Sequence, residues 1–171
     1  MPSGAERRPF WAIMAVVVVL DRITKMIAEP ALLGGTVVDV LGEVIRFRLV
    51  YNPGAAFGLG QGLGGMSRWI FFVVAAVAVV VLHRMSSEAP VGDRLRQWSL
   101  AIVAGGAFGN LIDRIISAPG VVDFIDVGVP GGWRWPTFNV ADMAVSCGAV
   151  ALAISLWLED RRRAAAGSAA N

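Results

Sequence analysis

The sequence has very few of the residue types that hold metals or form disulfides. It contains one cysteine, Cys147, and one histidine, His83, among 171 residues. A single cysteine excludes an internal disulfide and a multi-cysteine metal site, and a lone histidine leaves no ligand set for zinc. We therefore expect neither a metal nor a cofactor. Cys147 lies in an apolar run, which favours a small buried hydrophobic side chain.

Charged residues are also scarce. They make up 16% of the chain, against 56% hydrophobic residues, whereas charged residues are roughly a quarter of an average soluble domain. This balance indicates a membrane protein. The net charge of +2 is too small to indicate nucleic acid binding, and the basic residues gather at the ends of apolar segments rather than in a stripe.

Four apolar segments are long enough to cross a bilayer, whose core takes about 20 helical residues. They lie at about 10–28, 68–83, 97–116 and 138–158. The first follows a short basic lead and could pass for a signal peptide, but no small-residue cleavage site comes after it. We interpret it as a retained span. The expected fold is therefore an all-α membrane protein with four transmembrane helices in a single membrane domain, 1–171.

The region 36–65 differs in composition from the four spans. Its first part, Thr36–Val50, is rich in β-branched residues with a Leu-Gly-Glu break, and it predicts two short strands in a hairpin. The next part is too rich in glycine for a helix or a regular strand, and its glycines between 58 and 65 suggest a lid over a substrate. The tail at 164–171 is expected to be disordered.

Lysine and arginine are unevenly divided between the two ends of the spans. One side has Arg7, Arg8, Arg84, Arg94, Arg96, Arg161, Arg162 and Arg163, and the other has Arg46, Arg48, Arg68, Arg114 and Arg134. Cytoplasmic loops carry the excess of basic residues. Both termini are therefore predicted to be cytoplasmic, and the hairpin region to lie on the outer face.

Four of the thirteen acidic residues fall between Phe108 and Val145, beside segments that can enter a membrane: Asp113, Asp123, Asp126 and Asp142. Carboxylates are costly in or beside hydrocarbon, so their presence there indicates a function. Asp123 follows a Pro-Gly turn in an extended piece. Asp142 comes three residues after Asn139, a candidate N-cap, so favourable helix-dipole electrostatics is an alternative role for it. Asp126 is interpreted as a solvated loop acid.

Asp123 and Asp142 are the candidate acid–base pair of a peptidase. Two carboxylates within a few ångströms cannot both ionise cheaply, so one keeps its proton. The ionised group can then take a proton from water while the protonated group hydrogen-bonds the scissile carbonyl. The sequence has no G-x-S-x-G and no H-E-x-x-H motif. Its spacing allows the two acids to meet but does not require it.

Two polar pairs have four-residue spacing, which places both members on one helix face. Asp21 and Lys25 form either a structural ion pair, the commoner use of this spacing, or a pair that brings Lys25 to the site. Asn110 and Arg114 are expected to link helices and to reach the interface. Asp113, which lies between them, is interpreted as structural.

Five motifs occur in order: DRITK at Asp21–Lys25, NPGAAFG at Asn52–Gly58, GNLIDR at Gly109–Arg114, VVDFI at Val121–Ile125 and FNVAD at Phe138–Asp142. With these motifs the chain resembles the lipoprotein signal peptidases, the type II signal peptidases of bacteria. The match runs from the first span to the fourth. The resemblance implies four transmembrane helices with a small extracytoplasmic β-cradle, which agrees with the predicted hairpin.

The resemblance implies that Asp123 and Asp142 are the catalytic dyad of an aspartic endopeptidase. It implies substrate-binding or supporting roles for Asp21, Lys25, Asn52, Gly54, Asn110, Arg114, Asn139 and Ala141. Met143 stands where the family often has serine, which removes a hydroxyl beside Asp142.

The implied substrate is a diacylglyceryl-modified prolipoprotein, cut just before its lipidated cysteine at the outer leaflet of the bacterial cell membrane. The other expected partners are membrane phospholipid and the cyclic peptide inhibitor globomycin. We expect the chain to be a monomer.

Two other functions stay open on the residues alone. A small transporter or proton relay would also use membrane carboxylates, but it predicts internal repeats and charges at mid-bilayer, whereas these charges gather at the outer ends. A non-enzymatic assembly factor predicts that Asp123→Asn and Asp142→Asn leave function intact.

Overall fold

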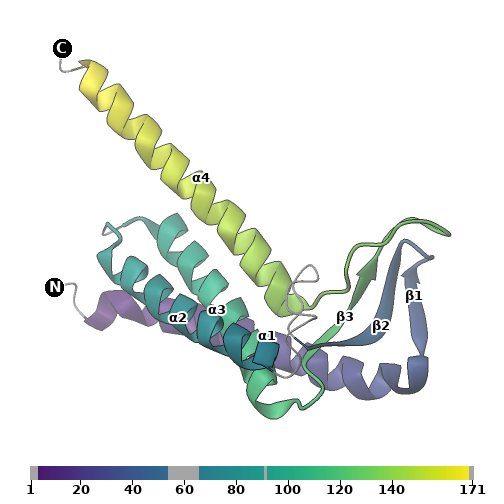
Figure 1. The fold of residues 1–171 in the computed structure, drawn as a ribbon. Coiled ribbons are helices and arrows are strands. Elements are labelled where there is room, and N and C mark those ends of the chain that lie inside the picture. The colour runs from purple at the N-terminus through teal and green to yellow at the C-terminus, as the bar shows by residue number, and fades with distance from the viewer. Residues whose placement is uncertain (1–3, 54–65, 91, 170–171) are drawn as a thin grey trace.

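The computed structural model describes residues 4–53, 66–90 and 92–169. The described chain contains the helices α1 (Gly4–Leu32), α2 (Met66–Glu88), α3 (Arg94–Ile116) and α4 (Val140–Ala169), a short 3-10 turn η1 (Leu33–Gly35), and the strands β1 (Val37–Leu41), β2 (Ile45–Asn52) and β3 (Val121–Val127). Figure 1 shows the helices as a bundle with the sheet at one end, where α1 ends and α4 begins. The fold is thus mostly helical with a small sheet.

Helix α3 lies at the centre of the bundle and packs against α1, α2 and α4. Small residues allow this close packing. A Cβ on Gly106 would lie 2.3 Å from the main-chain oxygen of Ala141 in α4, and a Cβ on Gly105 would lie 2.7 Å from Cβ of Val17 in α1. These glycines therefore let α3 approach both α1 and α4 closely.

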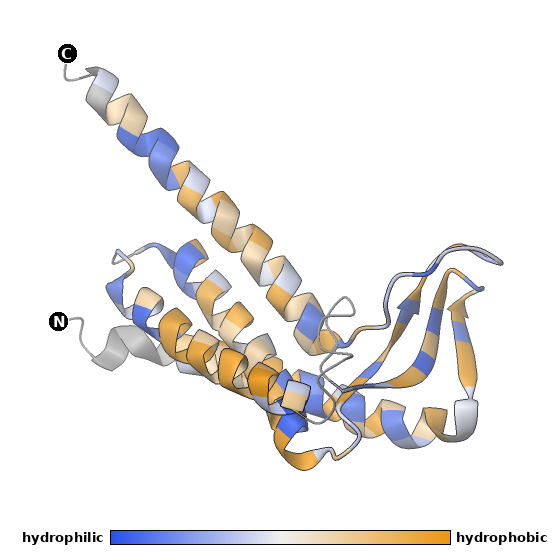
Figure 2. Ribbon diagram, in the orientation of Figure 1, coloured by the Kyte–Doolittle hydropathy of each residue, from blue (hydrophilic) through white to orange (hydrophobic). Residues whose placement is uncertain are grey.

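Three helices in the described part of the chain are long and apolar enough to cross a membrane: Met66–Glu88, Arg94–Ile116 and Val140–Ala166. Figure 2 shows these three helices coloured mostly as hydrophobic, with hydrophilic residues toward the helix ends, whereas the strands alternate between hydrophobic and hydrophilic residues. Helix α1 is not among the three. Its apolar stretch is interrupted by Asp21, Arg22 and Lys25, so the fourth span stays a prediction.

The sheet is antiparallel with the order β1-β2-β3. The predicted hairpin is confirmed by β1 and β2, and the extended piece that contains Asp123 is the third strand. In the register of β2 with β3, Val50 lies opposite Asp123 and Asn52 lies opposite Val121. The sheet is attached to the bundle by a small apolar core in which Phe124 packs with Ala28 and Leu32 of α1.

The prediction that Asp126 is a solvated loop acid is wrong. It lies in β3, its side chain is only 1% exposed, and it is paired with Arg46 and Arg134. Arg134 Nε lies 2.7 Å from one carboxylate oxygen, and Arg46 Nη2 lies 3.2 Å from the other. These charge-assisted bonds join β2, β3 and the loop after β3, and they compensate the charge that burial would otherwise leave unpaired.

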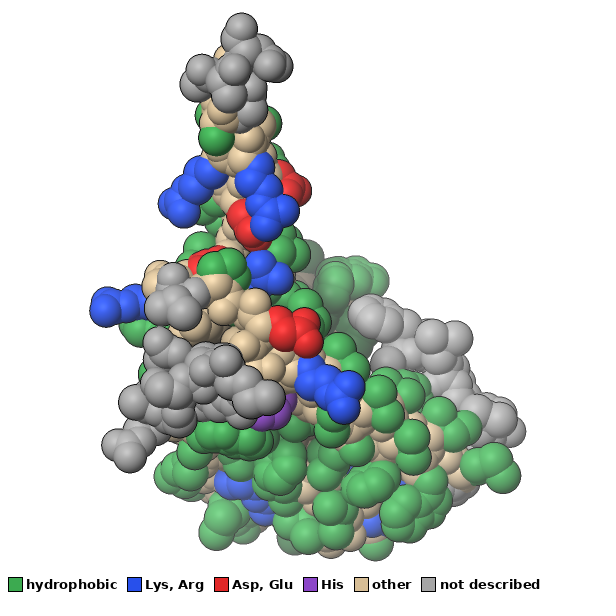
Figure 3. Space-filling view, turned by 90° about the vertical axis from the view of Figure 1, so that its left-hand side faces the viewer, with side chains coloured by type: hydrophobic (Ala, Val, Ile, Leu, Met, Phe, Trp, Pro, Cys, Tyr) green, Lys and Arg blue, Asp and Glu red, His purple; other side chains and the backbone are tan. Residues whose placement is uncertain are grey.

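Two further predictions differ from the structure. Cys147 is exposed on α4 instead of buried, because an apolar run in a membrane helix says nothing about which face meets other helices. Helix α4 continues to Ala169, through most of the tail that was expected to be disordered, because alanine extends an existing helix at the lowest cost. Figure 3 shows charged side chains gathered along this projecting helix, beyond a largely hydrophobic body.

The ion pairs of Asp126 lead to a prediction about stability and pH. Burial alone would raise the pKa of Asp126, but the hydrogen bonds from Arg134 and Arg46 outweigh it and hold the pKa below its ordinary value. A depressed folded-state pKa means that the stabilisation is complete above the unfolded pKa of about 3.9 and is lost as the pH falls through the folded value. We expect Asp126→Asn to lower the free energy of unfolding by roughly 2 kcal/mol at pH 7, because the amide cannot make the charge-assisted hydrogen bonds of the carboxylate.

Thermal unfolding in detergent, measured for both chains from pH 7 to pH 3, checks this prediction. The gap between the two chains should be constant down to about pH 4 and shrink below it. A gap that is the same at every pH would show that the charge of Asp126 contributes nothing.

Candidate active site

The start of α4 is fixed by a reciprocal cap between Asn139 and Asp142. The main-chain N–H of Asp142 donates to Oδ1 of Asn139 at 2.9 Å, and the main-chain N–H of Asn139 donates to Oδ2 of Asp142 at 3.1 Å. This is the geometry of a capping box, with aspartate in the place of the usual glutamate. The predicted N-cap is confirmed. Asp142 is therefore held rigidly in the first turn of the helix, where the helix dipole favours negative charge.

Asp123 is brought to the same place by β3. The side-chain amide of Asn139 donates to its Oδ1 at 2.7 Å, and the side-chain amide of Asn52, at the end of β2, donates to its Oδ2 at 3.2 Å. Asn139 thus hydrogen-bonds both candidate acids at once, one through its side chain and the other through its backbone. Asp123 is 2% exposed, so it lies away from solvent next to Asp142.

Asn110 of α3 connects this pair to the helix bundle. Its amide nitrogen donates to Oδ1 of Asp142 at 2.8 Å, and its oxygen accepts from Asn139 and from Lys25, both at 3.0 Å. The prediction that Asn110 links helices is confirmed. Both oxygens of Asp142 consequently accept a hydrogen bond, one from α3 and the other from the cap of its own helix.

Lys25 is the centre of a buried charge network behind Asn110. Its ammonium lies 2.8 Å from Asp21 and 2.7 Å from Asp113, and it also donates to Asn110. These three acceptors use all three donors of the ammonium group. Asp113 also pairs with Arg22, so two carboxylates face two cations. Lys25 is only 1% exposed, and such a group is tolerable only with this complete compensation.

The same network positions the backbone around the acids. Oδ1 of Asp21 accepts from the main-chain N–H of Ala141 at 3.0 Å, and Oδ2 of Asp113 accepts from the N–H of Val122 at 3.3 Å. Ala141 precedes Asp142 and Val122 precedes Asp123. Each buried carboxylate of the network therefore holds the residue before one of the two candidate acids, which gives the Asp21–Lys25 pair a structural role that extends to the site.

Burial and charge act together on Asp123. Burial raises the pKa of its carboxyl, the negative charge of Asp142 raises it further, and the hydrogen bonds from Asn52 and Asn139 and the charge of Lys25 lower it, with a net pKa of about 7. At neutral pH a large fraction of Asp123 is therefore protonated. The site contains the combination that acid–base chemistry needs, a protonated carboxyl beside a second carboxylate.

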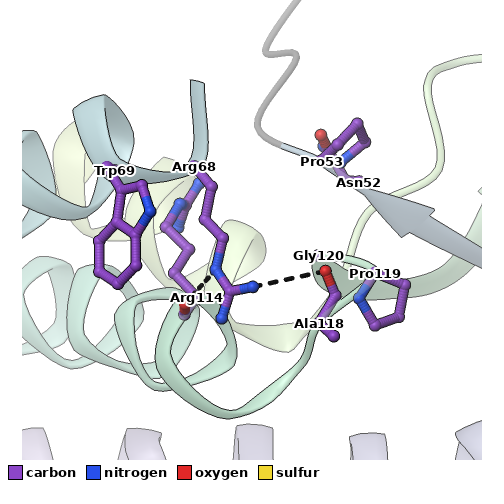
Figure 4. A pocket seen from close by; sticks show the side chains of 8 residues that line it. All are labelled: Asn52, Pro53, Arg68, Trp69, Arg114, Ala118, Pro119 and Gly120. Carbon is purple, nitrogen blue, oxygen red and sulfur yellow. Dashed lines mark hydrogen bonds between the residues drawn. The ribbon is translucent and has the colours of Figure 1, made fainter. Parts of the chain in front are cut away.

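Beside Asn52 lies a cavity of about 330 Å³ with two arginines in its wall. Figure 4 shows its lining residues Asn52, Pro53, Arg68, Trp69, Arg114, Ala118, Pro119 and Gly120. Arg68 donates to the main-chain oxygens of Arg114 at 2.5 Å, Ile115 at 3.1 Å and Ala118 at 3.4 Å. Its cation thus satisfies carbonyl groups that the end of α3 leaves free.

This cavity shows how the end of α3 is joined to the sheet. Gly120, with φ +125°, packs so closely that a Cβ would lie 2.3 Å from the main-chain oxygen of Asn52. Only glycine adopts this conformation at such a contact. Arg114 donates to the main-chain oxygen of Asn110 at 2.8 Å. The turn between α3 and β3 is therefore held by Arg68 on one side and by the end of β2 on the other.

The structure connects the predicted site residues that it describes by hydrogen bonds: Asp21, Lys25, Asn52, Asn110, Arg114, Asp123, Asn139, Ala141 and Asp142. Arg114 also lines the adjoining cavity. Gly54 and the suggested lid at 58–65 lie outside the described residues. Among the residues that the structure describes, no group of three or more His, Cys, Asp or Glu side chains could hold a metal ion.

Sequence reasoning missed Arg68 and Arg22. Arg22 lies inside the first motif without an assigned role, yet it pairs with the buried Asp113. Arg68 was counted only as a basic residue of the outer side, yet it binds the end of α3. The position of Arg68 at the start of an apolar span was the one available indication of a role. Its partners are main-chain oxygens, which no sequence motif can reveal.

Comparison with known proteins decides the family. The sequence profile of signal peptidase (SPase) II matches residues 13–158. The chain belongs to the signal peptidase II family. It is 40% identical over 152 residues to the lipoprotein signal peptidase of Treponema denticola, covering 85% of this chain and 86% of that protein. It is 41% identical over 164 residues to the lipoprotein signal peptidase of Hydrogenovibrio crunogenus, covering 92% and 90%.

The fold agrees with that of two solved bacterial membrane enzymes. A bacterial membrane enzyme structure determined by the in meso method at 2.3 Å resolution superposes with a TM-score of 0.76 and 27% identity, over 89% of each chain. A second such structure, at 1.9 Å resolution, superposes with a TM-score of 0.74 and 28% identity, over 86% of this chain and 92% of that one.

Family membership settles the choice between the functions that the residues left open. The chain is a peptidase of the bacterial membrane that removes signal peptides from prolipoproteins. The transporter and assembly-factor alternatives are set aside. The position of Asp123 and Asp142 at the junction of sheet and bundle is what the structure adds to this conclusion.

The contacts of Arg68 generate a prediction. Arg68→Gln removes a cation from the free carbonyl groups at the end of α3, and hydrogen bonds to charged groups are worth roughly 2 kcal/mol each. We expect a lower temperature of thermal unfolding in detergent and slower cleavage of a prolipoprotein substrate, because the turn that leads to Asp123 loses its support. The matched control is Arg84→Gln, which removes an exposed arginine near the other end of α2. Equal effects of the two substitutions would contradict this role.

Proposed function

We propose that the chain is an aspartic endopeptidase that cleaves diacylglyceryl-modified prolipoproteins just before the lipidated cysteine, with Asp123 and Asp142 as its catalytic pair. The observation that carries the proposal is the bridge through Asn139, which hydrogen-bonds both carboxylates. The bridge holds the two acids near each other, and two nearby carboxylates cannot both ionise cheaply, so they compete for one proton. This competition is the chemical basis of an aspartic peptidase.

The environments of the two acids suggest separate roles. Asp123 is the more buried, and its raised pKa makes it the member that holds the proton at neutral pH. It would donate a hydrogen bond to the scissile carbonyl oxygen and stabilise the charge that develops there. Asp142, ionised and fixed by its cap, would take a proton from the attacking water. When the amine leaves, a proton returns to it from the pair, and no covalent intermediate is needed.

The surrounding residues would hold this arrangement while the substrate binds. Asn52 and Asn139 orient Asp123, and Asn110 orients Asp142. Asp21 and Lys25 act one layer further out by fixing Ala141 and Asn110. Arg114, in the wall of the neighbouring cavity, is placed to bind a carbonyl group of an extended peptide. Globomycin would compete with the substrate for this site.

We also propose that α1 is a fourth transmembrane helix and that both termini are cytoplasmic. The charged part of α1 is packed against α3 and neutralised within the bundle, which removes the main cost of placing it in a membrane. The basic residues at the C-terminal end of α4 support a cytoplasmic terminus. The acids and the sheet then lie at the outer leaflet, and the chain acts as a monomer because the pair is complete within one chain.

Isosteric substitutions test the catalytic pair. We expect Asp123→Asn and Asp142→Asn each to reduce turnover roughly 100- to 10,000-fold, because neither amide can exchange the shared proton. The assay is cleavage of a purified diacylglyceryl-modified prolipoprotein in detergent or nanodiscs. Asp126→Asn, in the same strand but outside the pair, is the matched control and should retain turnover. Full turnover in both of the first two variants would exclude this mechanism while leaving the family membership untouched.

The pH dependence of turnover provides an independent test. A pair that shares one proton is active between its two apparent pKa values. Because Asp123 titrates at about 7 in the folded chain, the rate should fall as the pH rises above about 7 and the shared proton is lost. It should also fall in acid, as the second carboxyl becomes protonated. Initial rates from pH 4 to pH 9 measure the profile, and a flat profile would contradict a shared proton.

A further inference from the structure

Three polar residues of α1 lie one helical turn apart, and each of them contacts a different segment around the acids. Residues four apart share one face of a helix, which places Asp21, Lys25 and Glu29 in one line. Asp21 accepts from the backbone of α4, and Lys25 donates to Asn110 of α3. Glu29 accepts from Tyr51 of β2, the sole tyrosine of the chain, with 2.7 Å between Oη and Oε1. This line of contacts therefore joins α1 to α4, α3 and β2.

Strand β2 contacts α1 with one face and the candidate acids with the other. Side chains alternate between the two faces of a strand, and Phe47 and Leu49 pack on the apolar core that attaches the sheet to α1. Tyr51 continues this alternation toward α1. Asn52, the next residue, belongs to the opposite face, where its amide donates to Oδ2 of Asp123 at 3.2 Å. A contact on the α1 face of β2 therefore also fixes the residue that reaches the acids.

The ladder between β2 and β3 is irregular just before this point. The pairing shifts between Phe47 and Val50, and it resumes with Val50 opposite Asp123 and Tyr51 opposite Val122. Such an irregularity disrupts the ladder locally. The hydrogen bond from Tyr51 to α1 thus provides a fixed point outside the sheet, one residue before β2 ends.

We propose that Glu29 and Tyr51 are a positioning pair for the peptidase reaction, which holds the end of β2 on α1 and thereby keeps the amide of Asn52 directed at Asp123. Neither member of the pair belongs to the five sequence motifs. They act through Asn52 and touch no reacting atom. The inference rests on the proposed function, in which Asp123 holds the shared proton.

The charges around Asp123 give the direction of the effect. The charged groups that face it come from three helices: Asp142 of α4, Lys25 of α1 and Arg114 of α3. The hydrogen bond from Asn52 lowers the pKa of Asp123, because it stabilises the ionised form. If that bond is loosened, the pKa of Asp123 rises, and the protonated form persists to higher pH.

Tyr51→Phe tests the pair, because it removes the hydroxyl and keeps the ring. We expect the alkaline limb of the kcat/KM profile to move up by roughly half a pH unit, the effect of weakening one hydrogen bond to a carboxylate. We expect kcat at the optimum to fall about tenfold through poorer alignment of the acids, with KM little changed. The hydrogen bond to Glu29 raises the pKa of Tyr51 above its ordinary value, so Tyr51 itself does not titrate between pH 4 and pH 9.

Two substitutions at the acceptor complete this test. Glu29→Leu should shift the alkaline limb as Tyr51→Phe does, because it removes the acceptor. Glu29→Gln should keep the profile of the unmodified chain, because its amide oxygen can still accept from the hydroxyl. Initial rates from pH 4 to pH 9 with a diacylglyceryl-modified prolipoprotein measure each profile. An unshifted limb in the Tyr51→Phe chain, or equal shifts in both Glu29 chains, would overturn the proposal.

A double-variant cycle separates positioning from a general loosening of the sheet. Asn52→Ala removes the amide itself and should shift the alkaline limb at least as far as Tyr51→Phe. If the hydroxyl acts through this amide, the chain with both substitutions should match Asn52→Ala alone. Additive shifts would contradict the proposed role.

The matched control is Thr36→Val, which removes a hydroxyl that donates to the main-chain oxygen of Leu33, just after α1. It weakens the connection between α1 and the sheet without touching the positioning pair. We expect kcat and the alkaline limb to stay unchanged. A shift as large as that of Tyr51→Phe would count against the proposal, because any loosening near the end of α1 would then have this effect.

Thermal unfolding in detergent measures the contact without turnover. If Glu29 and Tyr51 interact, the Tyr51→Phe/Glu29→Leu chain should lose less in unfolding temperature than the sum of the two single losses. Additive losses would refute the pair. Retained turnover in the Asp123→Asn and Asp142→Asn chains would instead remove the proposed function, while the coupling between Glu29 and Tyr51 would still be measured. The two failures are therefore distinguishable.

Discussion

One asparagine determines the relation between the two acids. Asn139 donates its side-chain amide to Asp123 and its backbone N–H to Asp142, and its own oxygen accepts from the backbone of Asp142. The two bonds between Asn139 and Asp142 would form at the start of many helices. The bond from Asn139 to Asp123 connects the start of α4 to strand β3. A common way of beginning a helix has thus become the device that sets two carboxylates side by side, and the geometry of the site follows from where α4 begins.

This arrangement depends on a second layer of charge that lies behind the two acids within the bundle. Lys25, Arg22, Asp21 and Asp113 neutralise one another within the bundle, so they add no net charge to the site. Two of them hold backbone N–H groups next to the acids. In a region of low dielectric, such a network is stable only when every member is satisfied. The network therefore fixes the backbone at Ala141 and Val122, the residues that precede the two candidate acids.

Much of the fold and most of the site could be predicted from the sequence. Carboxylates beside apolar segments are conspicuous because hydrocarbon penalises them, and a β-branched stretch between two spans indicates strands. The missing parts involve partners that sequence position does not reveal. Asp126 meets Arg46 from 80 residues away, and Arg68 binds main-chain oxygens, which every residue has. The exposure of Cys147 was also out of reach, because a helix surrounded by lipid can be apolar on all faces.

The close contact between α3 and α4 at Gly106 restricts how a substrate can arrive. With less than one methyl group of space between Gly106 and the main chain of Ala141, no polypeptide can thread between these two helices beside the acids. A precursor must therefore reach the carboxylates from another side of the bundle. The packing of α3 on α4 thus narrows the directions of approach before any residue of the site makes contact.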